Sequence, residues 1–254
     1  MHCVRWLLIA SIGLSVLPLQ AQETTSALVE EAMTLAGRGE HAQAVQKLDR
    51  AIEREPKAAD IYYWRGRSHF CQGEIKKAVA DFDQLVKLTP KVESRQWERG
   101  IALYYAEEWE RGAKQFELYQ TYHDNDVENS VWRYLCVARD QGVAKAQQTM
   151  LPIKNDPRVP MMQIYDLYRG KSKPADVLAA IEGKDFSERE RTARAFYAHL
   201  YIGLWYEAAG DAELSAKHMK LAEEHKIGHY MWDVAHVHRL MRQKQDAPKN
   251  EQKK

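Results

Sequence analysis

The chain is poor in the residues that mark several classes of protein. Its 254 residues include only 3 cysteines, 8 prolines and 13 glycines. So few cysteines exclude a small domain held together by disulfides, and so little proline and glycine excludes a fibrous chain. No charge of one sign dominates either, because 37 basic residues are balanced by 36 acidic ones. Non-specific nucleic-acid binding, which needs a concentrated positive field, is therefore excluded.

Motifs of the common catalytic sites are also missing. The chain has no G-x-S-x-G nucleophile motif and no dinucleotide-binding fingerprint. RGKS at 169–172 resembles the end of a phosphate-binding loop, but Tyr165 stands where the first glycine of that loop belongs. DNDVEN at 124–129 lacks the glycine of a calcium loop. We therefore expect a protein that is not an enzyme and that uses no cofactor.

A long apolar run occurs only at the start of the chain. An uncharged stretch from Trp6 to Leu17 is followed by Pro18 and then by the small residue Ala21. The run of about 12 residues is too short to span a bilayer, and the pattern is typical of a secretory signal peptide. We expect residues 1–21 to direct export to the periplasm or outside of a bacterial cell and to be removed. An anchor that is not cleaved and a buried helix are the alternatives.

The rest of the chain repeats with a period of 34 residues. Small residues, capping glycines, large apolar residues and terminating prolines all recur at this interval. The period and the pattern are those of the tetratricopeptide repeat, which folds as two antiparallel helices, and residues 64–90 resemble it most clearly. The matching columns are Ala32, Gly66 and Gly100; Ala44, Ala78 and Gly112; Leu48, Phe82 and Phe116; Gly39 and Gly73; and Pro56 and Pro90.

The repeat phase divides the chain after the leader into several units. Prolines break the pattern between 151 and 186, where only short helices at 161–169 and 174–182 are expected. Ser187 and Glu190 then form a capping box that opens a longer helix. The predicted units are N-terminal repeats within 22–150 (25–58, 59–92, 93–126 and a divergent fourth from 127), the insert 151–186, a C-terminal part 187–243 with a divergent repeat at 196–229 and a capping helix at 228–243, and a disordered tail 244–254.

The sequence thus predicts an all-α fold, a tetratricopeptide-repeat helical array (an α-solenoid) with a divergent C-terminal repeat and a capping helix. The order of its parts resembles the NlpI-type tetratricopeptide proteins of bacterial envelopes. The matching stretches are ENSVWRYL at 128–135, QIYDLYRGKSKPADVLAAIEG at 163–183 and FYAHLYIGLWYEAAGDAELSAKHMKLA at 196–222. The resemblance implies an envelope adaptor, often a homodimer, that gathers cell-wall hydrolases or presents clients to a protease. The lipid-anchoring cysteine of those proteins is missing here, so no stable membrane anchor is expected after cleavage.

First helices of such an array line its concave face, and here they carry many aromatic side chains. Aromatic rings and arginines favour a protein or peptide partner with an acidic side chain or a C-terminal carboxylate. Packing of these rings against the insert or a second copy of the chain is the alternative. The predicted binding residues are Tyr63, Arg67, Phe70, Trp97, Ile101, Tyr104, Tyr105, Leu135 and Arg139.

Histidines near the C-terminus allow a different hypothesis. His225, His229, Asp233 and His236 fall at helical spacing, which makes a zinc site on one face geometrically possible. The segment HKIGH, however, lacks the glutamate that acts as the general base in zinc proteases. A metal-binding protein or hydrolase is thus an alternative to the adaptor, and a purely structural homodimer is another.

Two cysteines remain after removal of the leader. Cys71 and Cys136 fall in first helices two repeats apart. Helices pack at 8–10 Å, so about 20 Å separates the two residues, which is well beyond the reach of a disulfide. We expect both to be free, buried thiols. The sequence therefore predicts an exported, non-enzymatic scaffold that binds protein or peptide partners, with no nucleic-acid partner.

Overall fold

The protein is described by a computed structural model that places residues 23–183 and 185–246. The predicted signal peptide and the end of the predicted tail lie outside these residues. All regular elements in the described part of the chain are helices: α1 (Thr25–Gly37), α2 (His41–Arg54), α3 (Ala59–Cys71), α4 (Ile75–Leu88), η1 (Pro90–Arg95), α5 (Trp97–Tyr105), α6 (Trp109–Gln120), α7 (Val127–Gln141), α8 (Val143–Gln148), α9 (Met161–Tyr168), α10 (Pro174–Ala180), α11 (Glu188–Ala208), α12 (Ala212–Glu224) and α13 (Tyr230–Asp246).

Helices α1 to α6 form three antiparallel pairs in the predicted repeat phase. Small residues allow the two helices of a pair to approach closely. A Cβ atom on Gly100 would lie 2.6 Å from Cζ of Phe116, so only glycine fits opposite that ring. The first helices of repeats one and two end at Gly39 and Gly73, which have φ values of 81° and 72°, as the predicted left-handed caps require.

The fourth pair departs from this pattern. Its first helix, α7, has 15 residues, but its second helix, α8, has only 6. The chain then runs without regular structure from 149 to 160 and forms the short helices α9 and α10 within the proline-broken insert. Both lie where the sequence predicts helices. Helix α9 packs on α7, so the insert extends the helical array although it lacks the repeat pattern.

The C-terminal part begins with the predicted capping box. The amide of Glu190 donates to Oγ of Ser187 over 3.3 Å, and the amide of Ser187 donates to Oε2 of Glu190 over 2.9 Å. Helix α11 starts there and pairs with α12 in an antiparallel hairpin. None of the described helices combines the length and the apolar character needed to cross a membrane.

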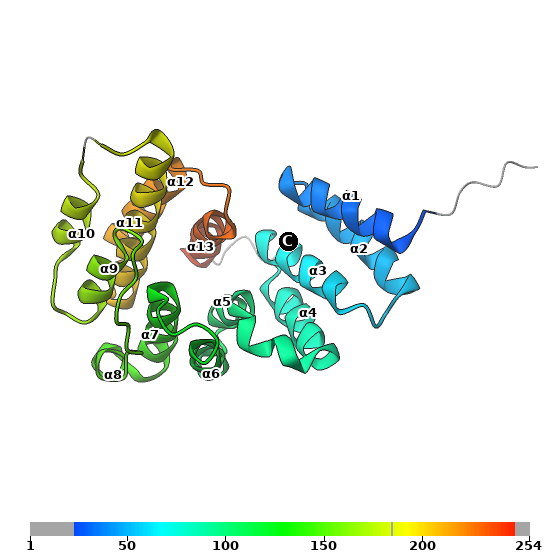
Figure 1. Ribbon diagram of the computed structural model, residues 1–254, viewed down its shortest axis with the longest axis horizontal. Helices are drawn as coiled ribbons and strands as arrows, with labels where there is room; N and C mark the ends of the chain where they lie inside the picture. Colours follow the sequence, from blue (N-terminus) through cyan, green and yellow to red (C-terminus); the bar gives the residue numbers. More distant parts are fainter. Residues whose placement is uncertain (1–22, 184, 247–254) are drawn as a thin grey trace, which may run out of the picture.

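The sequence predicts that the last helix caps the end of the array. In the structure, α13 also packs inside the arc of the other helices. Figure 1 shows the other helices in an arc, with α13 in the hollow between the α11–α12 pair and α3 with α5. Helix α13 packs against both α12 and α3, which lie at opposite sides of this hollow. Its apolar side chains Met231, Val234, Ala235 and Val237 are all buried. The apolar stripe of α13 therefore faces the interior of the arc, and not only the adjacent repeat.

Both cysteines of the described chain are free, as expected. Cys136 is buried in α7, where its sulfur packs close to Gly112. Cys71 differs from the expectation because it is only partly buried. It is the last residue of α3, where it borders two open pockets.

Candidate binding site on the concave face

The concave face of the array is largely covered by the protein's own C-terminal helices. Phe70, Ile101, Tyr104, Tyr105 and Leu135 are each 5% exposed or less. The ring of Phe70 lies 5.5 Å from that of Tyr230 in α13. These five residues belong to the core, which corrects the prediction that they line an open groove. The periodicity identified the face correctly, but a segment more than 90 residues away in the sequence covers it.

Polar groups of the covered face are paired inside the molecule. The hydroxyl of Tyr104 donates to Oε2 of Glu207 in α11 over 3.1 Å. The hydroxyl of Tyr105 is hydrogen-bonded to Nδ1 of His238 in α13 at 3.0 Å. Burial lowers the pKa of His238 to about 4, so this histidine is neutral near pH 7. Helix α13 is thus held by specific hydrogen bonds as well as by apolar contacts.

The two arginines predicted to bind a carboxylate have other partners. The Arg67 guanidinium lies 4.5 Å from the centre of the Tyr230 ring, and its Nη1 donates to the hydroxyl of Tyr63 over 3.0 Å. Tyr63 in turn donates to Oε1 of Glu98 over 2.7 Å. Arg139 is exposed and lies over the ring of Trp109. The two arginines do not converge on one site, so the geometry gives no support to an acidic ligand.

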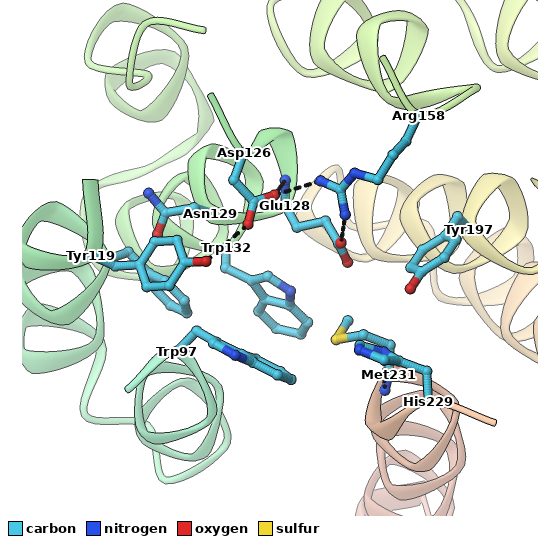
Figure 2. A pocket seen from close by; sticks show the side chains of 11 residues that line it. Trp97, Tyr119, Asp126, Glu128, Asn129, Trp132, Arg158, Tyr197, His229 and Met231 are labelled. Atoms are coloured by element: carbon cyan, nitrogen blue, oxygen red, sulfur yellow. Dashed lines mark hydrogen bonds and ion pairs between the residues drawn. The ribbon is translucent and has the colours of Figure 1, made fainter. Parts of the chain in front are cut away.

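Trp97 borders an open pocket together with residues that the sequence does not predict. The pocket has a volume of about 210 Å³ and lies where α5, α7, α11 and the start of α13 meet. Figure 2 shows Trp97 and Trp132 on one side of it, His229 and Met231 on another, and Arg158 at its rim. Trp97 stacks on His229 with ring centres 6.1 Å apart. The lining residues are Trp97, Phe116, Tyr119, Asp126, Glu128, Asn129, Trp132, Arg158, Tyr197, His229 and Met231.

Arg158 gathers three carboxylates at the rim of this pocket. Its Nη1 donates to Glu128 over 2.6 Å, and its Nη2 donates to Asp126 over 2.7 Å and to Asp156 over 2.6 Å. One guanidinium therefore faces three acidic groups, and the cluster carries an excess of negative charge. Arg158 and Asp156 come from the insert, which thus completes the pocket begun by α7.

Glu128 is the most perturbed of the three acids. Burial and the nearby Asp126 carboxylate raise its pKa to about 7, while Arg158 opposes this shift. The hydroxyl of Tyr201 in α11 also donates to Oε1 of Glu128 over 2.5 Å. The charge of the pocket consequently changes near neutral pH, when Glu128 gains or loses its proton.

Two polar atoms near the pocket lack hydrogen-bond partners within the described chain. They are Oδ1 of Asn129, an acceptor, and Nε1 of Trp132, a donor, and both are buried. Asn129 uses its amide nitrogen to donate to Gln120 over 2.9 Å, which leaves the oxygen available. Buried polar atoms without partners are uncommon in folded proteins, so these two atoms are candidates for a hydrogen bond to a ligand group.

Sequence reasoning missed most of this pocket. Glu128 falls on the predicted concave face of α7, but a single acid on a helix gives no sign that it lines a pocket. Arg158 lies in a loop, where no periodicity predicts its neighbours. One signal was available, because the acids at 124, 126 and 128 are followed by only one arginine within 149–160. Nothing in the spacing, however, shows that this arginine returns to α7.

The predicted C-terminal histidine site does not form. His225 stacks on His199 with ring centres 6.1 Å apart, whereas His229 stacks on Trp97. His236 bonds through Nδ1 to Glu223 over 2.7 Å. These histidines thus point to different partners, since His225 and His229 lie before α13 begins and do not continue its face. The hypothesis of a structural homodimer also loses its main support, because α13 already covers the aromatic face.

Comparisons with known proteins agree with the helical architecture. Residues 29–93 match the family profile described as a tetratricopeptide repeat. A tetratricopeptide repeat protein from Parabacteroides merdae has a similar structure, with a TM-score of 0.52, 15% identity, and coverage of 85% of this chain and 84% of that chain. MamA from residue 41 onward, from Desulfovibrio magneticus RS-1, gives a TM-score of 0.49 and 16% identity, covering 79% of this chain and 93% of that chain. The chain therefore has the fold of a tetratricopeptide-repeat array.

Proposed function

We propose that this protein is a non-enzymatic adaptor that binds a basic segment of a partner protein. The binding site is the pocket lined by Trp97, Trp132, Glu128 and Tyr197. The single observation that carries the proposal is the combination of excess acidic charge with aromatic walls in an open pocket. Tetratricopeptide arrays serve protein–protein interaction, and the chemistry of this pocket indicates the kind of side chain that it accepts.

A lysine or arginine side chain fits the chemistry of the pocket. The carboxylates of Asp126 and Glu128 attract a cation, and aromatic side chains that line the pocket, such as Trp97 and Tyr197, favour a cation over their rings. The free acceptor Oδ1 of Asn129 offers an additional hydrogen bond to an ammonium or guanidinium group. The N–H groups of a bound lysine or arginine would therefore have several acceptors in the pocket. The pocket is partly shielded from water, and charge-assisted hydrogen bonds are strong there.

The size of the pocket favours one inserted side chain. A volume of about 210 Å³ is below the range of about 300–1,000 Å³ that is usual for complete small-molecule sites. The rest of the partner segment would then lie along the surface beside α13. Arg158 does not favour an anionic ligand here, because its guanidinium already contacts three carboxylates.

A peptide-binding assay tests the proposal directly. The fluorescence of the tryptophans would be followed while lysine-rich, arginine-rich and glutamate-rich peptides of equal length are added. Basic peptides are expected to bind and to lose affinity as salt is raised, because exposed charges are screened within about 8–10 Å at moderate ionic strength. Binding of the acidic peptides alone, or equal binding of all three, would contradict the proposal.

Two variants and two matched controls locate the site. Trp97→Leu removes an aromatic wall, and Glu128→Gln removes an acidic charge while keeping the shape of the side chain. Each is expected to weaken basic peptides by about 5–30-fold, equivalent to about 1–2 kcal/mol. Trp109→Leu and Glu110→Gln change residues of the same types on α6, outside the pocket, and should leave the affinity unchanged.

Export and an envelope role form the second part of the proposal. They are supported by the signal-peptide pattern of residues 1–21 and by the resemblance to NlpI-type proteins. The partners would then be basic segments of envelope hydrolases or proteases. N-terminal sequencing of the protein recovered from a bacterial periplasm should give a start near residue 22. A start at Met1 in the soluble periplasmic fraction would argue against cleavage.

A further inference from the structure

Three potential metal ligands meet at the junction of three helices, away from the proposed peptide pocket. They are His41 at the start of α2, Cys71 at the end of α3 and Asp233 in the first turn of α13. One ligand atom from each residue lies within 4.8 Å of the other two. Within residues 23–183 and 185–246, this is the one cluster of three such side chains. The three residues are 30 and 162 positions apart in the sequence, so folding alone brings them together.

His41 provides an independent indication of a ligand. Its Nδ1 atom is buried and has no hydrogen-bond partner within the described chain. A neutral imidazole nitrogen that is removed from water and left without a partner is unfavourable unless another group completes it. A metal ion among the three side chains would complete it, because histidine binds metals through either ring nitrogen.

The donor set indicates which metal would bind. Thiolate and imidazole together favour zinc over calcium or magnesium, which prefer oxygen ligands only. Three protein ligands are the usual number at zinc sites that keep a fourth position open for water or another group. The charges also balance, since a thiolate and a carboxylate neutralise a divalent cation. This neutrality limits repulsion from Arg67, which borders the same region.

His236 lies beside this cluster but outside the group whose ligand atoms are within 4.8 Å of one another, so it would have to move closer to become a fourth ligand. It borders a cavity of about 370 Å³ together with His41, Cys71 and Asp233. Its Nδ1 is bound to the Glu223 carboxylate, so Nε2 is the nitrogen left for a metal. A carboxylate on the outer nitrogen is a common feature of metal-binding histidines, because it fixes the orientation of the ring.

The geometry points to a zinc-binding site formed by His41, Cys71 and Asp233, with His236 or water as the fourth ligand. The site joins the first two repeats to α13. Bound zinc would thereby fix the C-terminal helix in the hollow of the arc. This inference is independent of the peptide pocket, because that pocket contains none of the four ligands.

Zinc binding would be measured on the full chain without its leader and without a polyhistidine tag. Elemental analysis after dialysis against zinc should give about one ion per chain. Cobalt(II) in place of zinc should show the absorption band of a thiolate-to-cobalt transition. If the unaltered protein did not bind zinc, or if its cobalt complex showed no thiolate absorption, the inference would be wrong. These two results need no variant.

Ligand variants distinguish this site from adventitious binding. Cys71→Ser and Asp233→Asn should each weaken zinc by at least ~10-fold, and Cys71→Ser should abolish the thiolate band. His123→Gln, an exposed loop histidine, and His225→Gln are the controls that should keep full binding. Circular dichroism confirms that each variant is folded. Unchanged affinity in a folded Cys71→Ser variant, or loss of binding in His225→Gln alone, would contradict the proposed ligand set.

Discussion

Glu107 occupies a backbone conformation that is normally reserved for glycine. Its φ is 63°, and it lies 34 residues after Gly73, which has a φ of 72°. The same two hydrogen bonds close both helices. The amides of Gly73 and Glu107 donate to the carbonyl three positions earlier, and those of Glu74 and Glu108 donate to the carbonyl five positions earlier. The third repeat therefore keeps the capping geometry of the second repeat with a less suitable residue.

Replacement of Glu107 by glycine should stabilise the protein. A residue other than glycine in this conformation costs about 1–3 kcal/mol, and glycine removes this strain but loses more entropy on folding. We expect Glu107→Gly to raise the free energy of unfolding by about 1 kcal/mol in urea denaturation. Glu110→Gly, inside α6, should lower it by about 0.5–1 kcal/mol. Destabilisation by both substitutions would show that Glu107 is not strained.

Glu128 should make the stability depend on pH. Its pKa of about 7 in the folded protein lies above the value near 4.3 that is usual for an unfolded chain. The folded state thus binds the proton more tightly, so this contribution to stability is complete below about pH 4.3 and is lost as the pH rises through 7. At higher pH the group is charged, which the buried, acidic surroundings oppose.

The comparison of unfolding at pH 5 and pH 8 measures this effect. Relative to Glu128→Gln, which does not titrate, the unaltered protein should lose on the order of 2 kcal/mol over this interval. Glu110→Gln, an exposed acid, is the control for a general loss of charge and should follow the unaltered protein. Parallel curves for the unaltered protein and Glu128→Gln would mean that the pKa is not raised.

At the scale of a single element, α13 determines how much of the concave face is open to a partner. Tyr230 at its start is 4% exposed, and its ring contacts Phe70 and Trp97 at centre distances of 5.5 Å and 5.6 Å. Its hydroxyl is buried without a hydrogen-bond partner within the described chain. The ring therefore stabilises the docked helix, whereas the hydroxyl contributes little.

Two substitutions of Tyr230 separate these roles. Tyr230→Ala should destabilise the protein by about 3 kcal/mol, as is usual for truncation of a buried aromatic ring, and should increase amide hydrogen exchange in α13 and α3. Tyr230→Phe keeps the ring and should be neutral or slightly stabilising. If Tyr230→Ala left exchange in α13 unchanged, the docking of this helix would not depend on the contact.

The helix pairs could be predicted from the sequence because their contacts are local. Gly100 meets Phe116 within one hairpin, and a period of 34 residues is enough to show such a pair. The position of α13 could not be predicted in this way. Helical spacing places Met231 and Val234 on one apolar face, but it does not show which distant surface that face covers. Its contacts with Phe70 and Tyr105 depend on the curvature of the whole array.

At the scale of the whole molecule, a near-zero net charge conceals an uneven distribution. At one pocket, three carboxylates surround the single cation Arg158. The overall composition of 37 bases and 36 acids does not reveal this local excess of negative charge. Of the predicted binding residues, Trp97 and Tyr63 border pockets, but five others are buried in the core. The predicted ligand charge was not supported, because Arg67 is held by the Tyr63 hydroxyl and the Tyr230 ring, while acidic groups lie at the open pocket. Such pairing is decided by tertiary structure.

Site-specific photo-crosslinking in cells tests the central claim most directly. The crosslinking amino acid p-benzoylphenylalanine would replace Tyr197 at the edge of the pocket, and Tyr122, an exposed residue outside it, would be the control position. We predict that position 197, but not position 122, forms adducts with a partner segment rich in lysine or arginine. Adducts only at position 122, adducts at 197 with an acidic segment, or none at 197 would contradict the account.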